Sequence, residues 1–139
     1  MNQWRKRDPI KDYFPLPNEV FHLGLVPGEL AVYAYLLYCE DRQTYQCWPS
    51  YKTIGKAVGV CVNTVQKYVG SLVDKGLISA ENTSVINKDG QKRNGNLLYT
   101  ILPIQLAVDR YIQNQLDAAA TATAQARFER SHQQNRQSA

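Results

Sequence analysis

Two short amphipathic helices separated by a glycine turn occupy residues 50–76, and they constrain the fold more than any other feature of the chain. Ser50 can accept a hydrogen bond from the first turn of a helix, so it is a suitable N-cap. The apolar face of that helix consists of Ile54, Ala57 and Val58. Gly59 then stands where a left-handed residue ends a helix. The next helix has apolar residues at i, i+4, i+7 and i+8, namely Val65, Val69, Leu72 and Val73.

The segment before this pair predicts an extended strap followed by a longer helix. Prolines at alternate positions favour an extended path over residues 13–21 and exclude a helix there. Residues 24–42 predict a helix with Pro27 in its first turn and Glu29 at the positive end of its dipole. The face expected to be buried consists of Leu30, Ala34, Leu37 and Tyr38, with Tyr33 beside it.

Strand patterns stand on both sides of the helix pair. Residues 45–48 predict a short strand, and residues 77–83 and 97–102 predict two more, joined by a long polar hairpin loop. The order is helix, short strand, helix, helix, strand, loop, strand. It is typical of a winged helix-turn-helix, in which two helices joined by a tight turn precede a β-hairpin. The predicted fold class is therefore mainly α with a small β-hairpin (α+β): a three-helix core, a wing of two or three strands, and a C-terminal helix.

The sequence predicts four segments of different character. They are a mobile basic arm at residues 1–12, a winged helix-turn-helix domain at 13–102, a C-terminal helix at 103–117 and a low-complexity tail at 118–139. The tail is either a frayed helix or disordered, because it has almost no core to bury. The apolar face of the helix at 103–117 exceeds what the wing could cover, which favours a homodimer formed through this helix. The alternative is that this face packs onto the first helix of the same chain.

Positive charge is concentrated on the two central helices. Residues 51–76 contain four lysines and one aspartate, a net charge of +3, whereas residues 13–50 have a net charge of −3. The first twelve residues add a net charge of +2. Such a distribution suits a surface that faces phosphates, and a solvated helix face is the alternative interpretation.

The outward side of the second central helix carries side chains that match the edges of base pairs. The amides of Asn63 and Gln66 suit adenine, Lys67 can reach guanine or phosphate, and Val62 can touch a thymine methyl group. The N-terminal turns of a recognition helix are the part that enters the major groove. The residues expected to contact DNA from this helix are Val62, Asn63, Thr64, Gln66, Lys67 and Gly70.

Two further groups are expected to position the protein on the DNA backbone. At the first central helix, backbone amides and lysines make a surface that holds phosphate without reading sequence. Its members are Ser50, Tyr51, Lys52 and Lys56. In the wing, the cationic residues Lys88, Lys92 and Arg93, with Asn94 beside them, would follow the adjacent backbone or minor groove. A solvated hairpin tip is the alternative for the wing.

The stretch PSYKTIGKAVGVCVNTVQKYVGSLVDKGLI resembles a winged helix-turn-helix family with fixed glycine, apolar and hydroxyl positions. The matching residues are Pro49, Ser50, Ile54, Gly55, Gly59, Val60, Thr64, Val65, Val69, Leu72, Gly76 and Leu77. With the preceding LPNEVFHLGLVPGELAVYAYLLYCEDR, the chain is similar to the N-terminal domains of plasmid replication initiator A proteins and to small helix-turn-helix proteins of Gram-positive conjugative elements. The resemblance covers roughly residues 13–102 and implies a DNA-binding winged helix. One departure is Cys61, where the family usually has serine as the N-cap of the recognition helix.

Other classes of function find no support in the sequence. The three cysteines, even with His22, match no zinc-binding spacing, and no phosphate-binding glycine loop or catalytic constellation is present. We therefore expect no enzymatic activity, no cofactor and no metal, and no small-molecule ligand is evident. Because no apolar run reaches eighteen residues, we expect a cytoplasmic protein that does not enter the membrane.

The sequence thus predicts specific binding to double-stranded DNA. The chain would serve as a transcriptional regulator or as a replication initiator of a bacterial mobile element or plasmid. The alternative is a protein–protein interaction module of a replication or conjugation complex that does not read DNA directly.

Overall fold

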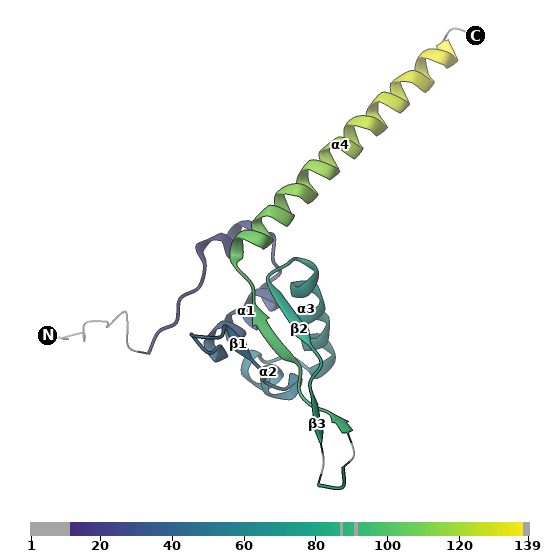
Figure 1. The fold of residues 1–139 in the computed structure, drawn as a ribbon. Coiled ribbons are helices and arrows are strands. Elements are labelled where there is room, and N and C mark those ends of the chain that lie inside the picture. The colour runs from purple at the N-terminus through teal and green to yellow at the C-terminus, as the bar shows by residue number, and fades with distance from the viewer. Residues whose placement is uncertain (1–11, 87, 91, 138–139) are drawn as a thin grey trace, which may run out of the picture.

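The computed structural model describes residues 12–86, 88–90 and 92–137 of the chain. Three helices and a sheet form the body, while one long helix and a narrow hairpin project from opposite ends of it (Figure 1). The elements in chain order are η1 (Asn18–His22), α1 (Pro27–Cys39), β1 (Gln46–Cys47), α2 (Tyr51–Val58), α3 (Val62–Asp74), β2 (Ile78–Glu81), β3 (Ser84–Ile86), β4 (Lys92–Asn94), β5 (Leu98–Ile101) and α4 (Ile104–Gln137).

The core lies where α1, α2 and α3 meet the sheet. The predicted apolar face of α3 is confirmed, because Val65, Val69 and Leu72 are buried and Val73 is partly buried. On α2, Ile54 is buried but Ala57 is exposed, so the buried face of this helix is narrower than the sequence predicts.

The predicted face of α1 was wrong in part. The buried residues on its core-facing side are Val32, Tyr33, Leu36 and Leu37, whereas Tyr38 is 66% exposed. Tyr38 instead lies 6.1 Å, between ring centroids, from Phe14 of the preceding segment. Apolar residues fill nearly every position from Leu30 to Cys39, so periodicity could not identify the side that faces the core.

The expected extended strap holds only as far as Pro17. From Asn18 the chain forms the 3-10 helix η1, in which the backbone amide of Val20 donates to the carbonyl of Pro17 over 3.3 Å. Pro17 itself stays extended just before the helix, so its ring does not obstruct the turn. Val20 is buried and anchors this segment in the core.

The sheet has β5 at its centre, with β1 and β2 antiparallel on either side of it. Tyr99 of β5 is buried opposite Cys47 of β1 and Ala80 of β2. The predicted polar loop after β2 contains a second, two-stranded ladder, β3 with β4, which pairs Val85 with Arg93. The wing is therefore a hairpin whose outer part has a ladder of its own, rather than two strands with an irregular connection.

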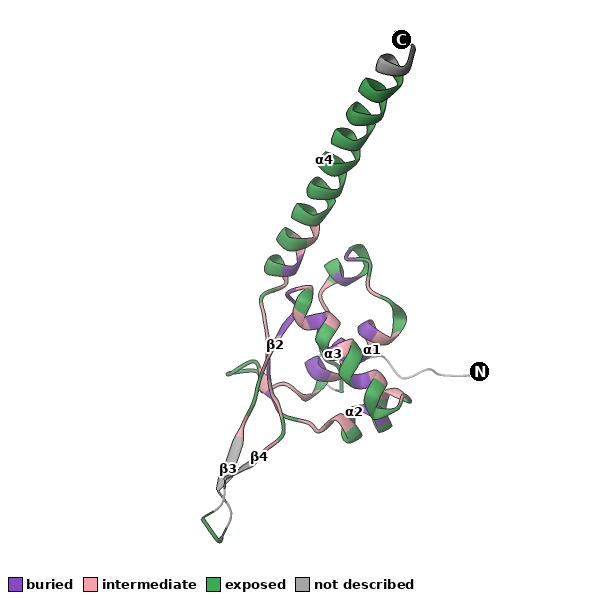
Figure 2. Ribbon diagram, turned by 90° about the vertical axis from the view of Figure 1, so that its right-hand side faces the viewer, coloured by how far each residue is buried: buried purple, intermediate pink, exposed green. Residues whose placement is uncertain are grey.

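The C-terminal helix continues well beyond its predicted end at residue 117. Helix α4 has 34 residues and reaches Gln137, so the segment predicted as a frayed helix or disordered tail is part of the same helix. Near its start Ile104, Ala107, Val108 and Tyr111 pack against the core. All side chains from residue 112 to residue 133 are exposed, as the uniformly green ribbon in Figure 2 shows.

Candidate nucleic-acid interface

Helix α2 begins at Tyr51 with Ser50 as its N-cap, as the sequence predicts. The backbone amide of Thr53 donates to Ser50 Oγ over 3.1 Å, which satisfies one of the free amides of the first turn. Lys52 and Lys56 are exposed on this helix. Tyr51 is partly buried and packs against the core, and the buried Tyr99 lies beside it. Burial raises the pKa of the Tyr99 hydroxyl, which belongs to the packing beneath the helix.

Two glycines set the angle between α2 and α3. Gly59 has φ +83°, and its amide donates to the carbonyl of Gly55 over 2.8 Å. A Cβ atom at the buried Gly55 would lie 2.6 Å from the carbonyl oxygen of Val60, closer than any real contact. The turn is therefore tight because α2 has no side chain where the chain folds back over it.

The outer face of α3 presents most of the predicted reading residues to solvent. Asn63, Gln66 and Lys67 are exposed, and the Val62 side chain is 44% exposed. At Gly70 no atom lies within 4 Å of the place a Cβ would take, so the backbone is open to approach. The opposite face of the same helix is fixed in the core, which gives the outer face a defined orientation.

The N-terminus of α3 lacks a side-chain cap. The Cys61 side chain accepts no hydrogen bond from the backbone amides of the helix, and its Sγ lies 3.0 Å from Thr64 Oγ1. The contact with Thr64 holds the pKa of the Cys61 thiol below its usual value. Thr64 is half-buried, and its hydroxyl contacts Cys61 at the start of the helix.

A buried ion pair ties α3 to α1. Glu29 is only 6% exposed and accepts hydrogen bonds from Lys75 Nζ at 2.6 Å and from Ser71 Oγ at 3.0 Å. From the sequence, Glu29 is expected at the positive end of the helix dipole and Lys75 in the positive cluster. Lys75 is instead neutralised by Glu29, so the exposed positive charge of the two central helices comes from Lys52, Lys56 and Lys67.

A second tie joins α3 to α4. The guanidinium of Arg110 donates to the carbonyl of Asp74 over 2.7 Å and lies 3.4 Å from that of Val73. A cation at the C-terminus of a helix satisfies free carbonyls and offsets the negative end of the dipole. The sequence does not predict this role, because Arg110 is far from α3 along the chain and no local pattern marks it.

The wing is attached to the segment that precedes α2. Asn96 Nδ2 donates to the carbonyl of Trp48 over 3.3 Å, and the hydroxyl of Thr83 donates to the carbonyl of Asn96. Trp48, which the sequence interpretation did not single out, is 63% exposed beside the start of α2. Lys88 is exposed at the turn between β3 and β4. Lys92, Arg93 and Asn94 form β4, and their side chains lie outside the described part of the structure.

Within residues 12–86, 88–90 and 92–137, no three histidine, cysteine or acidic side chains gather in a way that could hold a metal ion. In the same segments, no helix is long and apolar enough to cross a membrane.

Comparison with known proteins identifies the central segment. None of the curated proteins matches the chain. Among solved structures, a possible transcriptional regulator from Methanosarcina mazei Go1 is 21% identical, with a TM-score of 0.49, and the alignment covers 74% of this chain and 80% of that one. A probable transcriptional regulator from Pseudomonas aeruginosa is 22% identical, with a TM-score of 0.39, over 73% of this chain and 66% of that one. At these levels neither structure bears on function. Residues 23–78 match the family model described as "Helix-turn-helix domain", and with the geometry of α2, its turn and α3 this assigns a helix-turn-helix domain to the centre of the chain.

Proposed function

We propose that the chain binds specific sequences of double-stranded DNA and acts as a transcriptional regulator. One observation carries the proposal: the first turns of α3 hold Asn63, Gln66 and Lys67 in solvent while the opposite face is locked in the core. In helix-turn-helix domains this part of the second helix enters the major groove. The amides suit adenine and the ammonium suits guanine or phosphate, so the exposed set has the chemistry of base reading.

The surroundings of α3 supply the contacts that position it. The N-terminus of α2, with Lys52 and Lys56, would hold one phosphate backbone, and Lys88 at the wing tip would hold another. Thr64 contributes differently, because its hydroxyl contacts Cys61 and so orders the start of the helix. Gly70 leaves space for the sugar-phosphate backbone to approach α3.

A homodimer formed through α4 belongs to the same proposal. Ile112, Leu116 and Phe128 are 51%, 59% and 63% exposed on a helix that leaves the body of the protein. An isolated helix of this kind gains most of its stability from packing, and a second α4 would provide it. Two copies would then read two half-sites. Sedimentation equilibrium should give twice the chain mass of 15.8 kDa, and the double substitution Ile112→Glu and Leu116→Glu should reduce it to one chain. A Gln125→Glu control should stay dimeric, and a monomeric wild type would refute the dimer.

Selection from random duplexes, followed by fluorescence anisotropy with the selected site, tests the DNA-binding proposal. Replacing Asn63, Gln66 and Lys67 together by alanine should weaken specific binding at least about a hundredfold, since each good base contact is worth about 1–3 kcal/mol. The matched control replaces Gln125 and Arg127, an amide and a cation exposed on α4, by alanine and should bind like the wild type. Unchanged specific binding by the triple variant would show that α3 is not the reading helix.

The same selection separates the roles that the sequence resemblance implied. A site that overlaps a promoter supports regulation, whereas repeated sites at a replication origin of a plasmid or mobile element would support initiation. No affinity for any duplex at low salt would overturn DNA binding and leave the protein-interaction module, because nonspecific phosphate contacts alone bind DNA under those conditions.

A further inference from the structure

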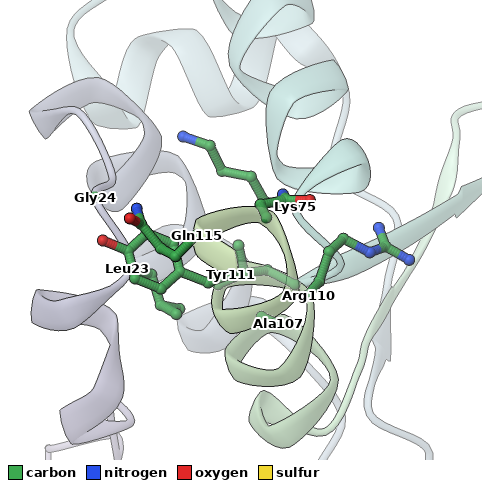
Figure 3. A pocket seen from close by; sticks show the side chains of 9 residues that line it. Leu23, Gly24, Lys75, Ala107, Arg110, Tyr111 and Gln115 are labelled. Carbon is green, nitrogen blue, oxygen red and sulfur yellow. The ribbon is translucent and has the colours of Figure 1, made fainter. Parts of the chain in front are cut away.

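A cavity of about 380 Å³ lies where α4 leaves the body of the protein, between the η1–α1 connection, the end of α3 and the first turns of α4 (Figure 3). This volume lies in the range of pockets that hold small molecules. Its floor is apolar, because Leu23, Leu77 and Ala107 are among the most deeply buried residues of the chain. An apolar floor of this kind binds a ligand by removing its hydrocarbon surface from water.

The rim of the cavity is polar and positively charged. Both charged residues that line it, Lys75 and Arg110, are cations, and no acidic side chain lines it. Glu29 occupies one of the three donors of the Lys75 ammonium. Arg110 donates to backbone carbonyls and forms no ion pair with any described residue. With Glu29 counted against Lys75, the cavity keeps one net positive charge, that of Arg110, which a bound anion would neutralise.

A phenol hydroxyl and a side-chain amide at the same rim have no hydrogen-bond partner among the described residues. Figure 3 shows Tyr111 and Gln115, one turn apart on α4, on the side of the cavity that faces Leu23 and Gly24. With the described residues, neither side chain forms a hydrogen bond, so the phenol hydroxyl and the amide are free to donate to a ligand. An apolar floor with a few convergent polar groups is the usual composition of a small-molecule site.

We infer that this cavity binds a small organic monoanion with an apolar body, such as an aryl or alkyl carboxylate. The hydrocarbon part lies on Leu23, Leu77 and Ala107, and the carboxylate lies at the rim that Lys75 and Gln115 share. Such a ligand contacts the end of α3 and the start of α4 at once, and it strengthens the docking that Arg110 already provides. The effect of the ligand on DNA binding rests on the proposed function. If α4 pairs two copies, the ligand fixes the spacing of the two reading helices and so changes the affinity for DNA.

Thermal unfolding of the full chain with phenylacetate as the probe tests the inference. A ligand with about ten non-hydrogen atoms should bind with a dissociation constant of roughly 1 mM. At about ten times that concentration the midpoint should rise by about 4–8 °C. Phenylacetamide, which has the same shape without the charge, should bind about tenfold more weakly, because charge-assisted hydrogen bonds are the stronger ones. Acetate, which lacks the apolar body, should give no shift at matched ionic strength.

Two pairs of variants locate the site. Gln115→Trp fills the rim from an exposed position and should abolish the shift, whereas Gln113→Trp, on the same helix but outside the cavity, should keep it. Arg110→Gln removes the charge and should reduce the preference for phenylacetate over phenylacetamide, whereas Arg127→Gln should leave it unchanged. No shift with phenylacetate, an equal shift with phenylacetamide, or full binding by Gln115→Trp would each overturn the inference.

DNA binding is measured separately, first without the probe. A chain that binds its selected duplex but shows no shift with phenylacetate refutes the ligand site and leaves the proposed function intact. A chain that binds phenylacetate but no DNA refutes the proposed function and leaves the ligand site intact.

Discussion

Replacing Cys61 by serine should stabilise the protein, because the start of α3 has the backbone of a capped helix without the cap. Ser50, at the start of α2, provides an internal template: its φ and ψ are −70° and 158°, against −75° and 163° for Cys61. Each residue has a threonine three positions later, and the side-chain contacts are similar, 2.9 Å for Ser50–Thr53 and 3.0 Å for Cys61–Thr64. Only Ser50 also accepts from the backbone amide.

The size of the effect follows from the same comparison. Removing the cap with Ser50→Ala should cost about 1 kcal/mol, and Cys61→Ser should gain a similar amount, since no backbone movement or repacking is needed at an exposed residue. A change of that size moves the midpoint of a chain of this length by about 3–5 °C. Calorimetry in reducing buffer should therefore show Cys61→Ser above the wild type. Cys61→Ala, which cannot cap, is the control, and equal midpoints for the serine and alanine variants would refute the reasoning.

Three further predictions concern α3 and its contacts. Lys75→Met should lower the free energy of unfolding in urea by about 2–3 kcal/mol, because it leaves Glu29 buried without its cation while water still reaches part of the site. Adding Glu29→Gln should recover part of this loss, and a single variant as stable as the wild type would contradict the account. Gly70→Ala should stabilise the helix by about 0.5–1 kcal/mol but weaken binding to the selected duplex roughly tenfold, so improved stability with unchanged affinity would show that no backbone approaches there. Iodoacetamide should modify Cys61 first in the native protein, because its pKa is lowered and more thiolate is present at neutral pH, and the rate should rise with pH until the thiol is fully ionised. Burial raises the pKa of Cys47 to about 12, so equal rates at Cys47 and Cys61 near pH 8 would refute the assignment.

Features encoded by neighbouring residues were predictable from the sequence. The cap at Ser50, the turn at Gly59 and the buried face of α3 each depend on residues within one or two helical turns. The solvent-facing positions of Asn63, Gln66 and Lys67 followed from that face, because the side opposite a buried stripe must point outward. The contacts of these residues with DNA depend also on the partner, which the periodicity of the helix does not encode.

Features that depend on distant residues were not predictable in this way. Glu29 and Lys75 are 46 positions apart, and only the packing of α1 against α3 brings them together. Arg110 caps a helix that ends 36 positions earlier. The buried face of α1 was misassigned for another reason: an almost uniformly apolar helix can be rotated without changing its pattern, so the neighbours that pack against it decide which side is buried.

The position of β5 affects how the domain forms during synthesis. This strand is the last of the sheet to be made, yet it lies between β1 and β2, which pair with it and not with each other. Residues 46–47 and 78–81 therefore have no sheet partner until the ribosome has released residue 101. Helices α1, α2 and α3 can associate before then, because their contacts are more local. Helix α3 can thus pack before the sheet closes, and the attachment of the wing at Asn96 needs residues that are made later.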